Sequence, residues 1–346
     1  MSDHETSPAL PRSAAWLDAR GLLQWLAALL VSGGLLVYLF SAYEVDPRGL
    51  GPIVREAAPA GLVAFVGISV IALVLRALRY WVLLERRVGL WPITLVTMVR
   101  NLFVDLLPAR AAGAASYLYL VTARLGLPLS AGLASFALAF IFDTLAIAPL
   151  LLVALLLVGA GPLPAWALVA GSLLILAGSA VALALLVPGL RLAGRWAAIL
   201  PGRAAGLGGL LVKTADEVVR LKTRRIFGTV LGLSLGLRLA KYGAYYCLLQ
   251  ALLVERGFPW GSLNFLQVFL TVAGSELAAS LPLPTVASLG PYEVAGAYGL
   301  AFWFGIPNAL AVLAATAFHL LSQVHDYGLG ILALLWIMGP WARRRS

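Results

Sequence analysis

The stretch "VLRALRYWVLLERR" (Val74–Arg87) decides how this chain folds, because it places two arginines inside an apolar run. Its last three residues are charged and suit the end of a membrane helix at the water boundary. Arg79 lies close enough to that end for its side chain to extend to water. Arg76 lies about 15 Å from Arg86 along a helix, at about 1.5 Å per residue, which is too far for such an extension. An ionisable residue held inside the membrane indicates a functional site.

The composition requires a membrane. The chain has 346 residues, of which 62% are hydrophobic and 12% charged, with a mean hydropathy of +0.95. Soluble domains carry roughly a quarter charged residues, so this composition cannot cover a water-exposed surface. The apolar runs are long and continuous, whereas a membrane β-barrel needs short alternating segments. We therefore predict an all-α, polytopic helical membrane protein.

About six apolar runs are predicted as full spans, and two further stretches as re-entrant helical hairpins; the alternative, in which each arm of these two stretches is a full span, fits the charge pattern equally well. The predicted spans are 22–41, 61–84, 130–158, 166–187, 226–254 and 308–338. The predicted hairpins are 91–125 and 263–304, with polar breaks at 106–114 and 280–293. Proline and glycine interrupt helices, and a broken backbone at membrane depth is tolerated only against protein or water. The hinge residues predicted at the breaks are Pro108, Gly113, Pro282 and Gly290.

The net charge of +10 indicates orientation. In a membrane protein a basic excess reports topology before it reports nucleic acid, and no nucleic-acid partner is predicted. The basic segment 189–225 and the tail "WARRRS" (Trp341–Ser346) are assigned to the cytoplasm of a bacterial inner membrane, and so are both termini. The amphipathic spacing within 189–225 also predicts contact with anionic lipids of the inner leaflet.

Two similar stretches predict an inverted repeat. "LRALRYWVLL" (Leu75–Leu84) and "LRLAKYGAYYCLL" (Leu237–Leu249) share an arginine, a second base and a tyrosine at the same spacing. Each precedes a broken pair of arms, and the charge pattern makes the two copies cross the membrane in opposite senses, a common transporter architecture. The predicted organisation is an N-terminal tail (1–21), a first span with an outer loop (22–60), repeat unit A (61–158), a connecting span (159–188), a basic linker (189–225), repeat unit B (226–338) and a basic tail (339–346).

Charged residues at membrane depth form the candidate substrate site. Arg238 lies about 20 Å along a helix from Arg225 and shares a helix face with Lys241. The candidate substrate-binding residues are Arg76, Arg110, Asp143, Arg238, Lys241, Glu276, Glu293 and Asp326. The alternative is that these charges form structural ion pairs that only fix helix packing.

The breaks and two histidines sharpen this hypothesis. A helix that begins at a break has unpaired backbone N–H groups, which bind an anionic headgroup together with a guanidinium such as that of Arg110. Glu293 at the second break offers a negative group, so a zwitterionic or cationic headgroup would use both. His319 and His325, near Asp326, are candidates for a proton relay, and hydrogen-bonded packing is the alternative.

No metal, cofactor or ATP-driven step is predicted. Cys247 is the single cysteine, so neither a disulfide framework nor a zinc site of several cysteines is available. "GGLLVKT" (Gly208–Thr214) lacks the glycine that precedes the lysine of a phosphate-binding loop and follows no strand.

Four runs, in this order and spacing, resemble the lysylphosphatidylglycerol synthase transmembrane region family: "RALRYWVLL", "NLFVDLLPARAAGAASYLYL", "GLPLSAGLASFALAFIFDTLAI" and "SLPLPTVASLGPYEVAGAYGL". The resemblance covers about residues 60–335 and implies a membrane domain that moves a lipid between leaflets. The residues at family positions are Arg76, Arg79, Pro108, Arg110, Gly113, Asp143, Pro282, Gly290 and Glu293.

This sequence also departs from the family pattern. Where the family often has Gly-Glu, Arg and Glu-Arg, this chain has Gly113-Ala114, Tyr117 and Ala139-Phe140, which leaves the headgroup open. In the synthases the membrane domain accompanies a cytosolic aminoacyl-transferase domain. We expect none in this chain and therefore no lipid aminoacylation.

The prediction is a flippase-like transporter and not an enzyme; it moves a polar or charged lipid between leaflets without an ATP-binding domain of its own. One alternative is a polytopic glycosyltransferase that uses a polyprenyl-phosphate-linked donor, since Glu44 and Asp46 form an acidic pair on the first outer loop. Another is a non-transporting membrane assembly or lipid-binding factor. The sequence leaves a homo-oligomer open.

Overall fold

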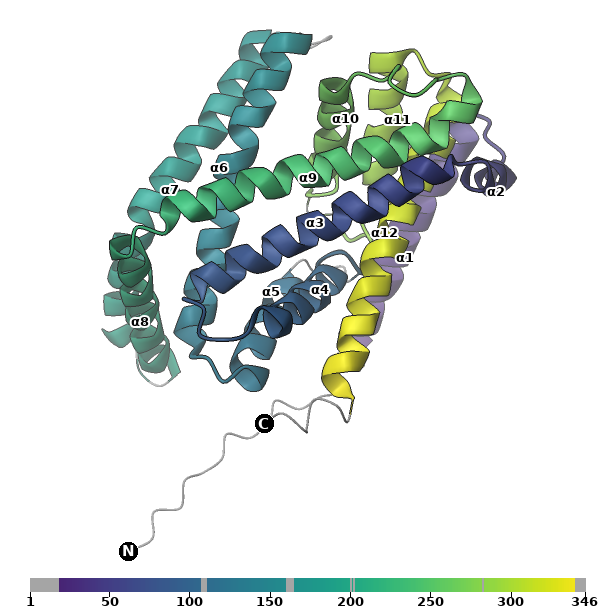
Figure 1. Cartoon of the computed structure of the whole chain (residues 1–346). Helices are drawn as coiled ribbons and strands as arrows, with labels where there is room; N and C mark the ends of the chain where they lie inside the picture. The colour runs from purple at the N-terminus through teal and green to yellow at the C-terminus, as the bar shows by residue number, and fades with distance from the viewer. Residues whose placement is uncertain are drawn as a thin grey trace, which may run out of the picture.

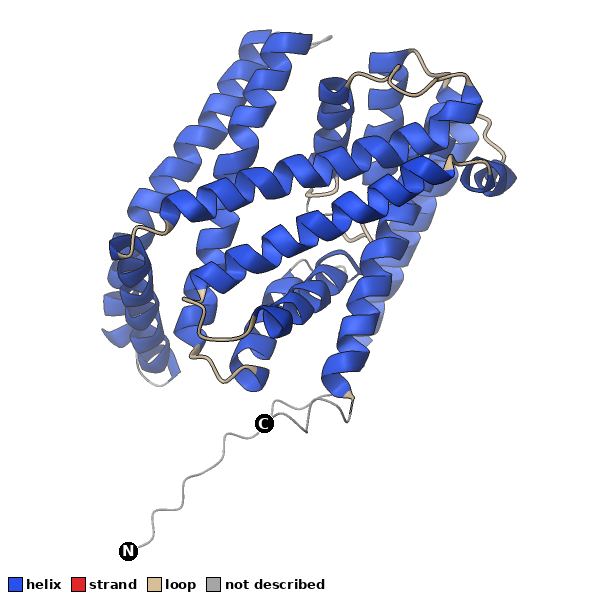
Figure 2. Cartoon of the chain, in the orientation of Figure 1, coloured by secondary structure: helices blue, strands red, loops and turns tan. Residues whose placement is uncertain are grey.

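Every regular element in the described part of the chain is helical (Figure 2). The computed structural model describes residues 19–106, 111–159, 165–199, 201, 203–281 and 283–339. The α-helices are α1 (Ala19–Ala42), α2 (Leu50–Arg55), α3 (Pro59–Leu83), α4 (Leu90–Leu106), α5 (Ala111–Tyr119), α6 (Leu129–Val158), α7 (Ala165–Ile199), α8 (Arg203–Thr223), α9 (Phe227–Leu253), α10 (Phe265–Ala278), α11 (Pro291–Phe304) and α12 (Asn308–Met338). The predicted all-α fold is confirmed.

Five helices are long and apolar enough to cross a membrane: α1, α3, α6, α7 and α12. They confirm a polytopic helical membrane protein. The sixth predicted span, 226–254, forms α9, which has 27 residues but does not reach the hydropathy of the other five. Arg238, Lys241 and several glycines within α9 lower its hydropathy. The predicted broken arms contain the shorter apolar helices α4 and α10.

Helices α3 and α9 lie side by side and run antiparallel across the molecule (Figure 1). At one end the backbone N–H of Ala58 donates to the carbonyl of Ala251 at 2.8 Å. At the other end the guanidinium of Arg79 donates to the hydroxyl of Ser234 at 3.0 Å. Gly61 permits this approach, because a Cβ there would lie 2.7 Å from the Cβ of Ala251. The two similar stretches therefore pack against each other in opposite directions.

The two halves have the same element order. Helices α3, α4, α5 and α6 form a long helix, two shorter helices and a second long helix, and α9 to α12 repeat that order. The antiparallel packing of α3 and α9 agrees with an inverted relationship. The repeat itself, the domain boundaries and the re-entrant path of the hairpins stay predictions.

The first break separates α4 from α5 between Leu106 and Ala111, where the helix was predicted to end. Pro108 and Arg110 lie outside the described residues. Gly113, which was also predicted as a hinge residue, lies in the first turn of α5. Its role is close packing, since a Cβ on Gly113 would lie 3.0 Å from the Cα of Val104 on α4.

The second break separates α10 from α11 between Ala278 and Pro291, and Pro282 lies outside the described residues. Gly290 has a φ of 102°, a conformation that residues with a side chain rarely adopt, so it does sit at the break. The backbone N–H of Val286 donates to the hydroxyl of Ser32 at 2.9 Å, which ties the break to α1. Glycine is required at position 290 for a second reason, since its Cβ would lie 2.7 Å from that of Leu35.

The basic segment is a helical hairpin. Helix α7 continues through Pro188 to Ile199, and α8 folds back against it, with the backbone at Gly208 close to that at Gly194. Beyond α8, Arg224 forms an ion pair at 2.9 Å with Glu85, which follows α3. The basic segment that was predicted to be cytoplasmic therefore lies against the charged end of α3, while its orientation in a membrane stays a prediction.

Candidate functional site

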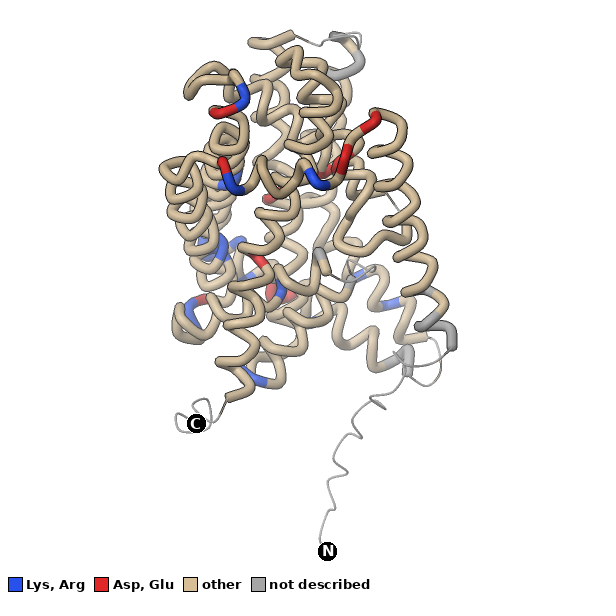
Figure 3. The backbone as a smooth tube through the Cα atoms, turned by 90° about the vertical axis from the view of Figure 1, so that its right-hand side faces the viewer, with Lys and Arg blue, Asp and Glu red and all other residues tan. Residues whose placement is uncertain are grey.

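A cavity of about 1310 Å³ lies between the two halves of the molecule and is bounded by α3 to α7 and α9 to α12. Its wall combines apolar and charged surface. The apolar wall includes Ile147, Leu151, Leu155, Ile175, Leu270, Leu277, Phe302 and Trp303. The charged residues in the wall are Arg76, Arg100, Asp143, Arg238, Lys241, Glu276 and Asp326. Six of the eight predicted binding residues are in this set. Figure 3 shows charged residues within the bundle as well as at its ends.

Asp143 on α6 is the centre of one ion cluster. The guanidinium of Arg79 donates to both carboxylate oxygens, with Nη1 to Oδ1 at 2.6 Å and Nη2 to Oδ2 at 3.0 Å. Arg238 on α9 brings its Nε to 3.6 Å from Oδ1 of the same carboxylate. The cluster therefore joins α3, α6 and α9. The carboxylate oxygens of Asp143 are already engaged by two arginines of the protein.

The expectation that Arg79 extends to the membrane boundary is wrong. Its side chain is only 1% exposed, and Asp143 and Ser234 hold it in the interior. A buried guanidinium without a partner would be costly, whereas the paired, hydrogen-bonded form is tolerated. The partners come from two other helices, so the sequence of α3 alone does not reveal them.

A second ion pair joins α9 to α10. Lys241 pairs with Glu276, and the hydroxyl of Tyr242 donates to the other carboxylate oxygen of Glu276 at 3.1 Å. The carboxylate of Glu276 is therefore neutralised and held in place at the cavity wall. For Asp143 and Glu276, the structural ion-pair alternative accounts for much of the arrangement.

Arg76 and Arg100 differ from these pairs. Both line the cavity, and no described carboxylate forms an ion pair with either guanidinium within 4.0 Å. Arg100 donates to the side-chain oxygen of Asn101 at 3.2 Å and packs 5.5 Å from the ring centroid of Phe136. Two guanidiniums, on α3 and α4, are thus available for an anion that enters the cavity.

Arg100 is a residue that the sequence reasoning missed. It lies in "TMVRNLFVD" (Thr97–Asp105), where an arginine interrupts an apolar run as Arg76 does. The same signal would have found it. The uncharged polar residues Asn101, Tyr245, Ser322 and Gln323 also line the cavity, but single polar residues in apolar helices carry no comparable signal.

The structure places Glu293 outside the cavity wall. Its side chain is fully buried, and Oε2 accepts a hydrogen bond from the backbone N–H of Gly290 at 2.7 Å. Oε1 accepts from Nδ1 of His319 at 2.5 Å. Glu293 therefore caps α11 and occupies the helix N-terminus that was expected to face a headgroup. Of this pair, only His319 lines the cavity.

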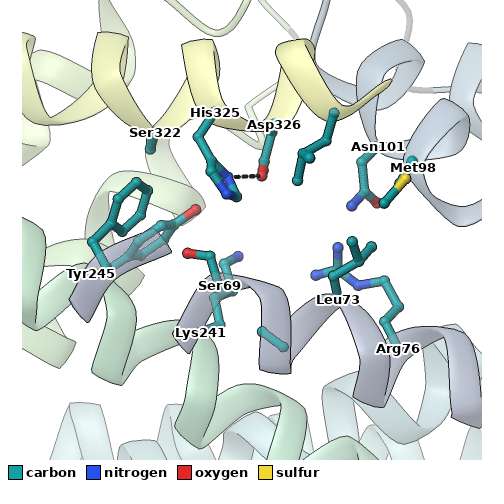
Figure 4. A pocket seen from close by; sticks show the side chains of 13 residues that line it. Ser69, Leu73, Arg76, Met98, Asn101, Lys241, Tyr245, Ser322, His325 and Asp326 are labelled. Carbon is teal, nitrogen blue, oxygen red and sulfur yellow. Dashed lines mark hydrogen bonds and ion pairs between the residues drawn. The ribbon is translucent and has the colours of Figure 1, made fainter. Parts of the chain in front are cut away.

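A second cavity, of about 40 Å³, lies between α3, α4, α9 and α12 (Figure 4). His325 lines this small cavity, while Arg76, Lys241 and Asp326 line both cavities. The two cavities therefore share charged residues of their walls, and the small cavity adjoins the charged part of the large one.

The family model described as lysylphosphatidylglycerol synthase TM region matches residues 25–330. The match contains every residue that lines the two cavities. The comparison with curated proteins found no match, and neither did the comparison with solved structures.

Proposed function

The chain belongs to the lysylphosphatidylglycerol synthase TM region family, and from this premise we propose that it moves a phosphate-bearing membrane lipid between the two leaflets. Its long apolar helices and its family make it an integral membrane protein with a lipid-related function. In this proposal it lies in a bacterial inner membrane with both termini in the cytoplasm. It acts as a transporter and not as an enzyme.

One observation carries the proposal: a cavity of about 1310 Å³ has a charged part and an apolar part. A phospholipid likewise has a charged headgroup and apolar acyl chains. Its headgroup would lie at Arg76 and Arg100, because each guanidinium grips two phosphate oxygens at once. Lys241 neutralises Glu276, and Asp143 meets two guanidiniums, those of Arg79 and Arg238, so neither cluster adds a net negative charge that would oppose an anion at Arg76 and Arg100.

The acyl chains would follow the apolar wall between α6–α7 and α10–α11. A charged group at the centre of a bilayer costs at least about 2.5–3.5 kcal/mol, so an unassisted headgroup crosses slowly. A cavity that supplies arginines and hydroxyl groups at membrane depth lowers this cost. Movement is then downhill or coupled to an ion gradient, because no ATP-binding domain is proposed.

The proposal is tested with the full chain in proteoliposomes. Three fluorescent probes are compared: phosphatidylglycerol, phosphatidylethanolamine and a glucosyl diacylglycerol that has no phosphate. We expect the two phosphate-bearing probes to cross faster than in protein-free liposomes, and the glucosyl lipid to show no comparable gain. Equal rates with and without protein for all three probes would overturn lipid translocation.

We also propose that the basic linker contacts anionic lipids of the inner leaflet. Lys213, Lys222, Arg224 and Arg225 are exposed, and each base near an anionic surface contributes about 1 kcal/mol. Replacement of all four by glutamine should reduce the number of anionic lipids that stay bound in native mass spectrometry. An unchanged number would contradict this contact.

A further inference from the structure

The two histidines of α12 have different hydrogen-bonding states. His319 uses both ring nitrogens: Nδ1 donates to Glu293, and Nε2 accepts from the side-chain amide of Gln323 at 2.6 Å. The same amide donates to the carbonyl of Ala287 at 2.6 Å. A neutral imidazole with its proton on Nδ1 satisfies all of these contacts. His319 therefore has no nitrogen left to accept a further proton.

His325 is in the opposite situation. Its Nδ1 lies 3.0 Å from Oδ1 of Asp326, and an ionised carboxylate only accepts, so Nδ1 carries the proton of the neutral ring. The other nitrogen, Nε2, then has a free lone pair. This atom is buried, and no group in the described part of the chain hydrogen-bonds to it. The ring of Phe65 packs edge-on at 5.2 Å and offers no polar partner.

The surroundings of His325 are polar and roomy enough for water. The small cavity of about 40 Å³ has room for about three water molecules, at roughly 10–15 Å³ each. The charged or titratable groups that face it are Arg76 from α3, Lys241 and Tyr245 from α9, and Asp326 from α12 itself. Helix α4 contributes the uncharged Asn101. Figure 4 shows these side chains arranged around one space, with His325 joined to Asp326.

We propose that His325 is a proton-binding site that is coupled to the binding of the lipid headgroup. The inference rests on the proposed function, since the headgroup is the anion that Arg76 would bind. The proton comes from the aqueous phase, is passed on by water in the small cavity, which gains one proton as it gives one up, and is taken by Nε2 of His325. The imidazolium that forms then pairs with Asp326.

The coupling follows from the position of Asp326, which lines the small and the large cavity together with Arg76. While His325 is neutral, the negative charge of Asp326 opposes an anionic headgroup and offsets the charge of Arg76. When His325 is protonated, its charge offsets Asp326 instead. Arg76 then acts on the headgroup with less competition, so the headgroup binds more tightly. By linkage, headgroup binding must favour proton uptake by the same factor.

The experiment measures binding of fluorescent phosphatidylglycerol to the full chain in nanodiscs, at about pH 5.5 and about pH 8, on either side of the usual histidine range. Couplings between sites are commonly about 5-fold to 150-fold, so we expect at least about fivefold tighter binding at the lower pH. His325→Gln should bind weakly at both pH values. His325→Lys, which keeps a positive charge at both, should bind tightly at both.

A matched variant is His319→Gln in the same helix, which should lose thermal stability and keep the pH response. The proposal is overturned if His325→Gln keeps the pH response, or if His325→Lys binds as weakly as His325→Gln. Comparison of the two variants at one position separates charge from folding. If the wild-type chain moves lipid at equal rates and binds it equally at both pH values, only the coupling fails. If it moves no lipid at either pH, the proposed function fails as well.

Discussion

Arg79 and Asp143 lie 64 positions apart in the sequence and meet through two hydrogen bonds, of 2.6 and 3.0 Å, in the interior of the bundle. The arginine belongs to α3 and the aspartate to α6, on either side of the first broken pair of helices. The pair therefore fixes how the long helices of the first half pack. Arg238 of α9 forms a further ion pair with the carboxylate of Asp143, at 3.6 Å, and so connects the second half of the molecule to the first.

Arg79→Ala should lower the free energy of unfolding by about 3 kcal/mol, because it leaves the carboxylate of Asp143 with a weaker partner inside the protein. Thermal unfolding in detergent measures the change. The matched control is Arg191→Ala: Arg191 pairs with Asp216 at 3.1 Å, but both side chains are about half exposed, so its loss should cost less than about 1 kcal/mol. Equal losses for the two variants would contradict the interior role of Arg79.

Arg76→Ala and Arg100→Ala should each slow the movement of phosphatidylglycerol in proteoliposomes by about tenfold or more. A hydrogen bond to a charged group contributes about 1.5–3 kcal/mol, which corresponds to this range. Arg76→Lys should keep only part of the rate, because an ammonium cannot grip two phosphate oxygens in one plane. Arg195→Ala, an exposed arginine outside the cavity wall, is the control and should keep the wild-type rate. Wild-type rates in both alanine variants would exclude a headgroup at these arginines.

Glu293→Gln should fold and transport with a smaller loss of stability than Glu293→Ala, because its one amide oxygen still accepts from Gly290, while its NH2 group replaces the oxygen that faces His319. Glu293→Ala should lose about 2–4 kcal/mol of stability, since it removes a helix cap and leaves a buried imidazole N–H without an acceptor. Thermal unfolding and the lipid assay are run on both variants. If Glu293→Gln is stable and inactive, the negative charge of Glu293 has a functional role that capping does not explain.

Gly290→Ala should destabilise the protein by about 1–3 kcal/mol, because a side chain at a φ of 102° is strained and would also meet Leu35. Gly232→Ala is the control. Gly232 lies within α9 with open space at its Cβ position, and alanine is the better helix former by about 1 kcal/mol. The melting temperatures of the two variants should move in opposite directions. A shift of the same sign and size would contradict the strained geometry at the second break.

Replacement of both Glu44 and Asp46 by alanine separates transport from the glycosyltransferase alternative. Both residues are exposed, and Asp46 accepts a hydrogen bond from the backbone N–H of Arg48 at 2.9 Å, which gives it a role in the turn. A translocator should keep its lipid movement within about a factor of two, since removal of an exposed cap has a small effect. Loss of transfer of a sugar from a polyprenyl-phosphate donor in the double variant would favour the enzyme instead.

Much of the fold could be predicted because its causes are local in sequence. The apolar runs predict helices at membrane length, and α3, α6 and α12 begin and end within two residues of the predicted spans. Proline and glycine predict the breaks before Ala111 and before Pro291. An arginine within an apolar run predicts a place in the interior, and Arg76 does line the cavity.

The candidate site could be predicted only as a set of charges. The pairing of these charges depends on contacts between helices that are distant in sequence. Arg79 has such a partner, whereas no ion pair of Arg76 is found among the described residues. Glu293 was expected to face a substrate, whereas in the structure its carboxylate is buried, accepts from the first backbone N–H at the start of α11 and lies outside the cavity wall.

The sequence by itself determined that this protein crosses a membrane as helices, that two pairs of helices are broken, and that cations interrupt apolar helices. Hydropathy and backbone conformation depend on neighbouring residues, so these features are readable along the chain. Only the tertiary structure decided which acid each cation meets and which histidine keeps a free nitrogen. The free energies of ion pairs and hydrogen bonds depend on distances of a few ångströms between helices that are far apart in sequence.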